Sequence, residues 1–333
     1  MRNQLQLSHG GGGEEMNRLI HELFYDAFGN DVLLAAEDAA ALHVSGNIAF
    51  TTDGFTVSPI FFNGGDIGKI AVAGTVNDLA MMGAKPLYLS AAFIIEEGLE
   101  LDDLKRIVLS MKNELAKSGA KIVCGDTKVV PRGACDKIFI TTSGIGEIVQ
   151  SGISAHNISE GDAIIVSRDI GTHGATILAA REGIDLSGDI QSDCETLWGV
   201  VEKLLASGLH VKALRDATRG GLAAVLNEWA VASNVCIEID EESIPVSDAV
   251  KGICELLGFE AYDFANEGTF VMAIEAKDAD KALHVMHDFG FTCNAARIGK
   301  ATNEKVQKVI MHSPWGSRRY LELPKGELLP RIC

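Results

Sequence analysis

The final residue of this 333-residue chain is a cysteine, Cys333, and it follows Pro330, Arg331 and Ile332. Proline fixes its own φ and has no amide hydrogen, so Pro330 and Pro324 both disfavour a helix here and predict an extended, mobile tail. A thiol on such a tail could be offered first to a donor, then to an active site, then to an acceptor. The alternative is a frayed terminus whose cysteine has no role.

Three aspartates occupy positions that favour ligand chemistry. Asp53 and Asp126 each follow a predicted strand, and α/β folds bind ligands at the carboxyl ends of their strands. Asp78 lies in an apolar helix, where a carboxylate is costly to bury without a partner. Three carboxylates that converge need divalent cations, so the sequence predicts a metal site. A pair of satisfied polar side chains at a helix edge is the alternative for Asn77 and Asp78.

Two glycine-rich turns precede predicted helices. Residues 10–13 are all glycine and lead into a helix over residues 14–28, while Gly220 and Gly221 open a helix over residues 222–232. Backbone amides at such a helix N-terminus can bind phosphate. For residues 10–13 a flexible leader is the alternative.

Composition excludes several classes of protein. The net charge is −17, from 46 acidic and 29 basic residues, which argues against binding nucleic acid or an anionic membrane. The seven cysteines are scattered without a CxxC pair, so we expect neither a disulfide framework nor a zinc site, but a reducing cytoplasm. We expect no secretory signal, and no apolar run approaches the ~20 residues of a membrane span.

The chain is long enough for two domains. We predict an α/β (α+β) protein with an N-terminal domain at 1–150, a C-terminal α/β domain at 151–320 and a tail at 321–333 that carries the terminal thiol. The first domain has the predicted order β-α-β-α-β-β, with strands at 48–52, 87–95, 120–124 and 137–149 and helices at 66–83 and 102–117. The second has predicted strands at 163–167, 235–239 and 269–274 and predicted helices after 171–174, near 192–206, and at 222–232, 246–257 and 278–289.

Motifs along the whole chain resemble one family. They are His9-Gly-Gly-Gly-Gly, Thr52-Asp-Gly-Phe, Phe61 to Lys69, Gly74-Thr-Val-Asn-Asp, Gly125 to Val130, Asp216 to Gly221, Asn266-Glu-Gly and the terminal Pro330-Arg-Ile-Cys. Together they resemble the HypE family of hydrogenase maturation proteins, within the aminoimidazole-ribonucleotide-synthetase (PurM-like) superfamily. The terminal motif is specific to that family.

This resemblance implies a fold and a reaction. The implied fold is PurM-like, with an N-terminal mixed sheet that joins a second copy in a dimer barrel and a C-terminal α/β sandwich. The implied reaction is an ATP-dependent carbamoyl dehydration, which converts a carboxamide on the sulfur of Cys333 to a thiocyanate and supplies cyanide ligands for the iron of [NiFe] hydrogenase. Phosphorylation makes the carboxamide oxygen a good leaving group, and phosphoryl transfer depends mostly on positioning and charge stabilisation.

The resemblance also implies roles for individual residues. Mg²⁺ would bind Asp38, Asp53, Asp78 and Asp126, and ATP would bind Gly10, Gly11, Gly12, Gly13, Lys69, Asn77, Asp78, Gly125, Asp126 and Thr127. Of two candidate bases we assign Glu267, with Lys128 as its electrostatic partner, because a lysine near phosphates normally stays charged. His9 is a weaker candidate for either task. Arg331 would guide the tail, or is simply a solvated charge.

The implied partners are a second copy of the chain, a HypF-like carbamoyltransferase that loads Cys333, and a HypC–HypD-like iron scaffold complex that takes the cyanide. One alternative is another ATP-using enzyme of the superfamily, such as a thiamine-monophosphate kinase, a purine synthetase or a selenophosphate synthetase. The last normally carries its reactive cysteine near the N-terminus, where residues 1–15 have none. The other alternative is a non-catalytic carrier that only presents the tail.

Overall fold

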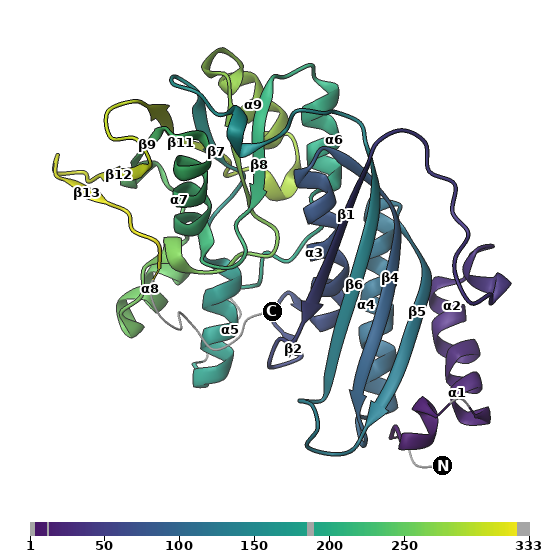
Figure 1. Ribbon diagram of the computed structural model, residues 1–333. Helices are drawn as coiled ribbons and strands as arrows, with labels where there is room; N and C mark the ends of the chain where they lie inside the picture. Colours follow the sequence, from purple (N-terminus) through teal and green to yellow (C-terminus); the bar gives the residue numbers. More distant parts are fainter. Residues whose placement is uncertain (1–3, 12, 185–189, 325–333) are drawn as a thin grey trace.

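The computed structural model describes residues 4–11, 13–184 and 190–324. These residues form two large sheets with helices packed on them and one small two-stranded sheet (Figure 1). The N-terminal sheet has four strands in the order β1-β6-β4-β5, so β1 and β5 are its two edges. All pairs are antiparallel except β4 with β5. The strands of this part are β1 (Ile48–Phe55), β2 (Phe61–Phe62), β3 (Gly65–Asp66), β4 (Ala84–Glu96), β5 (Lys121–Val130) and β6 (Ile138–Ile148).

Helices α3 (Ile67–Met81) and α4 (Leu101–Ser118) cover one face of this sheet. Asp66 caps α3, because its carboxylate accepts hydrogen bonds from the amides of Gly68 (2.8 Å) and Lys69 (3.0 Å). A Cβ at Gly68 would lie 2.4 Å from the carbonyl oxygen of Ile107, so glycine lets the two helices approach closely. Helix α3 is buried on nearly all sides because it lies between the N-terminal sheet and the C-terminal part.

An N-terminal helical segment flanks α4 beside β5. It consists of α1 (Glu14–Leu19), a π-helical stretch (Ile20–Tyr25) and α2 (Asp26–Phe28). The ring of Phe24 packs on that of Phe93, with centroids 4.9 Å apart. Within the described residues no helix covers the opposite face of the sheet, where Phe50 and Ile94 are 67% and 43% exposed.

The C-terminal part is built on a seven-stranded sheet in the order β13-β12-β9-β11-β7-β10-β8, antiparallel except for β12 with β9. On β7, Ile164 and Val166 share an apolar cluster with α5, α7 and α8, while Ala163 and Ile165 face α6 and α9, so helices cover both faces. The strands are β7 (Ala163–Val166), β8 (Val211–Asp216), β9 (Cys236–Asp240), β10 (Phe270–Ile274), β11 (Ala296–Thr302), β12 (Lys308–His312) and β13 (Arg318–Tyr320). The helices are α5 (Thr172–Glu182), α6 (Trp198–Ala206), α7 (Gly221–Ser233), α8 (Asp248–Leu257) and α9 (Ala279–His287).

The predicted α/β fold is confirmed, and so is the β-α-β-α-β-β order of the first part apart from the two-residue strands β2 and β3. The prediction for the second part was incomplete, because it lacked β8, β11, β12 and β13. The helix predicted near 192–206 begins only at Trp198, and its buried face is apolar. No helix of the described chain is long and apolar enough to cross a bilayer.

Candidate functional site

A cavity of about 520 Å³ lies between β1 and α3 on one side and the turn from β8 to α7 on the other. Four acidic residues line it, two from each part of the chain: Asp53, Asp78, Asp216 and Glu267. Arg215 and Arg219 line the same cavity. The site is therefore formed where the two parts of the chain meet, at the carboxyl end of β8 and beside the N-terminus of α7.

Two glycines at the N-terminus of α7, Gly220 and Gly221, have backbone conformations that favour glycine. Gly220 and Gly221 have φ values of +73° and +59°, a region that other residues rarely adopt. A Cβ at Gly221 would also lie 2.4 Å from the carbonyl oxygen of Phe264. The predicted Gly-Gly helix start is confirmed, and it brings Thr218 and Arg219 to the cavity wall.

Burial raises the pKa values of the carboxylates in the cavity, and neighbouring negative charge adds to this for Asp53 and Asp216. Burial is the largest cause of the raised pKa of Asp53, followed by the charge of Asp78. Burial also raises the pKa of Asp78, against a hydrogen bond of 2.6 Å from the hydroxyl of Thr51. Burial and the charges of Asp78 and Asp53 raise the pKa of Asp216 to about 7, although Arg215 and Arg219 oppose this. Among the described residues, however, no three of these acids have ligand atoms that all lie within 4.8 Å of one another, so one chain does not form a closed three-carboxylate cation site.

Glu267 is the most deeply buried of these acids, with 2% of its surface exposed. Its Oε1 atom has no hydrogen-bond partner among the described residues. Burial, and then the charges of Asp193, Asp216, Asp53 and Asp78, raise its pKa well above the ordinary value. A buried carboxylate oxygen without a partner is costly, so this atom is available to a ligand or to a proton.

Two residues predicted to bind ATP, Asn77 and Lys69, do not line this cavity, and their polar groups are already engaged. Asn77 donates to the carbonyl oxygens of Glu195 (3.0 Å) and Glu267 (3.3 Å) and accepts from the amide of Leu197 (2.7 Å). Lys69 donates to the carbonyl oxygen of Gly64 (3.1 Å) and lies 3.7 Å from a carboxylate oxygen of Glu195. In this chain both side chains join the two parts of the molecule.

The other predicted residues gather at the opposite edge of the N-terminal sheet. A second cavity of about 240 Å³ is lined by Asp38, Gly125, Asp126 and Thr127, beside the N-terminal helix. Nζ of Lys128 donates a hydrogen bond of 2.7 Å to Asp126, and this bond is the main reason that the pKa of Asp126 is lowered. A Cβ at Gly10 would lie 2.4 Å from the amide nitrogen of Val129, so Gly10 packs closely against β5. Gly12, Arg331 and Cys333 lie outside the described residues.

The predicted metal ligands therefore fall into two groups. Asp53 and Asp78 line the first cavity, whereas Asp38 and Asp126 line the second. Asp53 belongs to edge strand β1 and Asp126 to edge strand β5, and the sheet order puts β6 and β4 between them (Figure 1). A single chain thus does not bring all three predicted carboxylates together.

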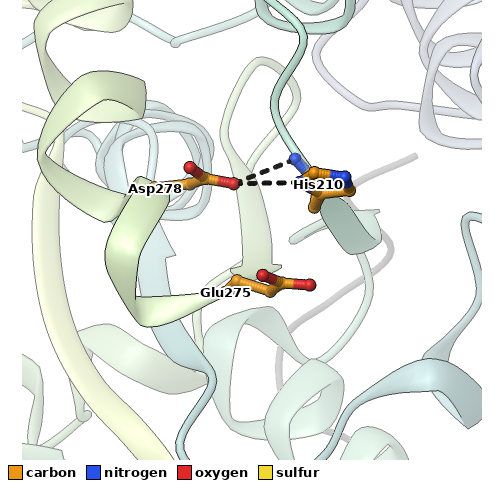
Figure 2. Close-up of side chains that lie close together, drawn as sticks. All are labelled: His210, Glu275 and Asp278. Atoms are coloured by element: carbon orange, nitrogen blue, oxygen red, sulfur yellow. Dashed lines mark hydrogen bonds and ion pairs between the residues drawn. The ribbon is translucent and has the colours of Figure 1, made fainter.

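A third cluster, of His210, Glu275 and Asp278, lies away from both cavities (Figure 2). Its ligand atoms lie within 4.8 Å of one another. Asp278 accepts hydrogen bonds from the amide (3.2 Å) and ring (3.4 Å) of His210. The oxygens of Glu275 lie 3.6 Å and 2.6 Å from the ammonium groups of Lys212 and Lys277, so two lysines already balance the negative charge of this cluster.

Asp216 and Arg219 belong to the motif from Asp216 to Gly221, but the sequence did not predict either of them as a site residue. Asp216 ends β8, a strand that the sequence analysis missed, so its position at a strand end was not apparent. The signal that could have revealed it is the pattern of an aspartate closely followed by a Gly-Gly helix start.

Comparisons with known proteins agree with this architecture. Residues 36–148 match the family model of the AIR synthase related protein, N-terminal domain, and residues 159–312 match that of its C-terminal domain. The chain is 46% identical over 338 residues to carbamoyl dehydratase HypE of Escherichia coli K12, covering 99% of this chain and 100% of that protein. The chain belongs to the HypE family. It is 45% identical to the Rhizobium leguminosarum member, covering 99% and 95% of the two chains.

Solved structures of the HypE family match closely. A crystal structure of hydrogenase maturation protein HypE in complex with ATP gives a TM-score of 0.96 at 44% identity, covering 99% of this chain and 100% of that one. A HypE–HypF complex gives 0.81 at 47% identity, covering 92% and 99%. A thiamine-monophosphate kinase shares only the fold, at 22% identity and a TM-score of 0.70, covering 89% and 95%. The enzyme is thus a hydrogenase maturation carbamoyl dehydratase, and the kinase, synthetase and carrier alternatives are not favoured.

Proposed function

We propose that the chain uses ATP to dehydrate a carboxamide carried on its own Cys333, giving the thiocyanate that supplies cyanide to hydrogenase iron. The observation that carries this proposal is the cavity between the two parts of the chain. Asp53, Asp78 and Asp216 line it together with Glu267, whose buried Oε1 has no hydrogen-bond partner among the described residues. Asp53 and Asp78 suit the cations that accompany a phosphate chain, and Glu267 offers a proton acceptor. The ATP complex of the HypE relative supports the choice of nucleotide.

The proposed reaction converts R–S–C(O)NH₂ and ATP to R–S–C≡N, ADP, phosphate and a proton. The carboxamide oxygen attacks the γ-phosphorus, a new P–O bond forms, and the bond from that phosphorus to ADP breaks. The C–O bond then breaks and phosphate leaves with the oxygen. The two amide protons depart, one on the phosphate and one to solvent by way of a base.

We assign Glu267 as that base. Its pKa is raised by burial and by neighbouring carboxylates, and a carboxylate with a raised pKa accepts a proton more readily than an exposed one. Its 2% exposure keeps bulk water away from its own carboxylate. Arg219, beside the N-terminus of α7, is placed to stabilise negative charge on the transferred phosphoryl group.

The cavity offers Mg²⁺ the carboxylate oxygens of Asp53 and Asp78, whose charge a cation would offset. Among the described residues no three acids of this cavity have ligand atoms within 4.8 Å of one another, so one chain does not supply a closed three-carboxylate site. Asp53 and Asp78 would contribute ligands from one chain. When bound, Mg²⁺ offsets phosphate charge during phosphoryl transfer.

We propose that a second copy of the chain supplies the remaining residues. The uncovered face of the N-terminal sheet carries rows of aligned side chains, such as Ile94 beside Phe139 and Lys128, which a second sheet would bury in a barrel. In such a homodimer, Asp38, Asp126, Thr127 and Lys128 of one chain, with Gly10 to Gly13, would complete the cavity of the other. This arrangement would reunite the carboxylates that one chain keeps at opposite edges of its sheet.

The start of the tail lies close to the cavity. Pro324 is the last described residue, and its ring lies 4.0 Å from where a Cβ of Gly220 would be, at the start of α7. Cys333 follows nine residues later, so covalent geometry lets its thiol reach at most about 30 Å from there. We retain domain boundaries at 1–150 and 151–320, with residues 321–333 as the tail that delivers the carboxamide.

We further propose that a HypF-like carbamoyltransferase loads Cys333 and that a HypC–HypD-like iron scaffold receives the cyanide, in the cytoplasm. The HypE–HypF complex of a relative supports the first partner. The net charge of −17 favours partners with basic docking surfaces.

Phosphate release tests the proposal. We expect Mg·ATP to yield about one phosphate per chain in a single turnover when Cys333 carries the carboxamide, and none from the unloaded chain. Equal release from both would indicate an unrelated ATPase. For the homodimer, Ile94→Asp should lower the sedimentation mass from dimer to monomer, and Leu256→Asp, on α8 and 66% exposed, is the matched control. A dimer that survives Ile94→Asp would contradict the barrel.

A further inference from the structure

The extended segment at residues 190–197 crosses from the C-terminal part to the N-terminal part. Its first half is tied to β2–β3, where the amide of Ser192 donates to the carbonyl oxygen of Asn63 (2.9 Å). In its second half the amide of Thr196 donates to the buried carboxylate of Glu114 (2.7 Å) on α4. With the bond from Leu197 to Asn77 on α3, these contacts fix the segment at both ends.

Asp193 lies in the middle of this segment and is 2% exposed. Its carboxylate accepts three hydrogen bonds: from the amide of Glu267 (3.0 Å), the amide of Gly268 (3.0 Å) and the hydroxyl of Thr269 (2.7 Å). All three donors belong to the turn that enters β10. This concentration of donors offsets the cost of burying a charge.

The same turn requires glycine next to Glu267. A Cβ at Gly268 would lie 1.9 Å from the carbonyl oxygen of Asp193, so the two backbones are in direct contact. The turn therefore rests on Asp193 through both its side chain and its main chain.

The side chain of Glu267 has no such support of its own, because its Oε1 lacks a partner among the described residues. Its direction is therefore set by the backbone that carries it. That backbone is fixed by Asp193 and by Asn77, which donates to the carbonyl oxygen of Glu267 (3.3 Å).

We propose that Asp193 is a positioning residue for the dehydration: it holds the 267–269 turn so that the carboxylate of Glu267 points into the cavity. This inference rests on the proposed role of Glu267 as the base. Asp193 is itself kept from substrate, since its carboxylate is occupied by the three donors and the surrounding segment is clamped to α3 and α4. A displacement of the base of about 1 Å can slow a reaction about 100-fold.

The test follows a single turnover by intact mass, with Cys333 already loaded with a carboxamide. Asp193→Asn keeps the side-chain shape but offers an NH₂ group where the carboxylate accepted hydrogen bonds. We expect normal loading of Cys333, ATP binding within about twofold of wild type, and dehydration about 10- to 100-fold slower. Thr269→Val removes the 2.7 Å bond to Asp193, together with a longer one of 3.4 Å to the carbonyl oxygen of Asp169, and leaves the two amide bonds to Asp193 in place. It should slow the same step by a smaller factor, and it replaces Asp193→Asn as the test if that variant folds poorly.

Asp162→Asn is the matched control, because Asp162 is also buried and accepts two bonds, from the amide (2.8 Å) and hydroxyl (3.2 Å) of Ser159, but does not line the cavity. It should lose stability without slowing dehydration. The decisive variant is the pair with Glu267→Gln. If Asp193 acts through Glu267, adding Asp193→Asn to Glu267→Gln should slow the step by less than about twofold.

The outcomes separate the two claims. A Glu267→Gln variant as fast as wild type would refute the base assignment itself. A slow Glu267→Gln with an undiminished Asp193→Asn would overturn only the positioning role. The positioning role would also be overturned if the double variant slowed dehydration by the product of the two single factors, because Asp193 would then act independently of Glu267.

Discussion

Replacing Asp216 with asparagine should stabilise the unliganded chain at neutral and alkaline pH. Asp216 is buried beside Asp78 and Asp53, which together with burial raise its pKa to about 7 from an ordinary 3.8. Between these two values the folded chain keeps a proton that the unfolded chain releases, so the free energy of unfolding falls as pH rises and levels off above about pH 7. Asparagine has the same shape and cannot ionise, so the free energy of unfolding of the variant should not fall with pH in this way.

The magnitude follows from the pKa shift. One pKa unit corresponds to 1.36 kcal/mol, so the shift from 3.8 to about 7 predicts a loss of about 4 kcal/mol in wild type across this range. Urea denaturation at pH 5 and pH 8, without nucleotide or metal, should therefore show an advantage for Asp216→Asn that is about 3 kcal/mol larger at pH 8. Asp162→Asn is the control, because it removes a buried carboxylate that does not line the cavity. An Asp216→Asn advantage that is the same at both pH values would refute the electrostatic account of the cavity.

Three further predictions concern the same junction. Asn77→Ala should lower the free energy of unfolding by roughly 2–5 kcal/mol in urea denaturation, because it leaves the buried amide of Leu197 and the carbonyl oxygen of Glu195 without this partner; a loss below 1 kcal/mol would contradict this. Gly221→Ala, at φ +59° and 2.4 Å from the oxygen of Phe264, should weaken ATP binding in calorimetry or prevent folding, and unchanged affinity would show that the start of α7 does not contact the nucleotide. Mg·ATP at 100 times its Kd should add about 2.7 kcal/mol to the stability of wild type in thermal unfolding, and Asp53→Asn or Asp78→Asn should reduce that gain; an undiminished gain would remove these residues from the site.

Local sequence patterns were enough to predict most helices and strands of the N-terminal part. The apolar length of α3 and the amphipathic spacing of α4 predicted these helices, and the strands between them followed. Strand β11 gave no such signal, because Arg297, Gly299 and Lys300 interrupt its apolar pattern. Strand β13 is exposed throughout and pairs on one side only, so its sequence carries no burial pattern.

The extended conformation of residues 190–197 could not be predicted locally, because it depends on tertiary contacts. Asn77, Glu114 and the turn at Glu267 hold this segment, and all three are distant in sequence. A helical interpretation of residues 192–197 was therefore wrong.

The candidate site was predicted in part. The structure does place Asp53, Asp78 and Glu267 around one cavity. That Asp126 lies elsewhere depends on the strand order β1-β6-β4-β5, which no local pattern encodes. Asp216 was missed together with its strand.

The most direct test of the account is the intact mass of the protein at two stages, with Cys333→Ala alongside. Incubation with a carbamoyltransferase and carbamoyl phosphate should add one carboxamide group to wild type, and Mg·ATP should then remove the mass of one water. Neither change should occur in the variant. A carboxamide that loads but never loses water would leave a carrier and contradict the proposed chemistry on Cys333. Loading of the Cys333→Ala variant would show that another residue carries the group.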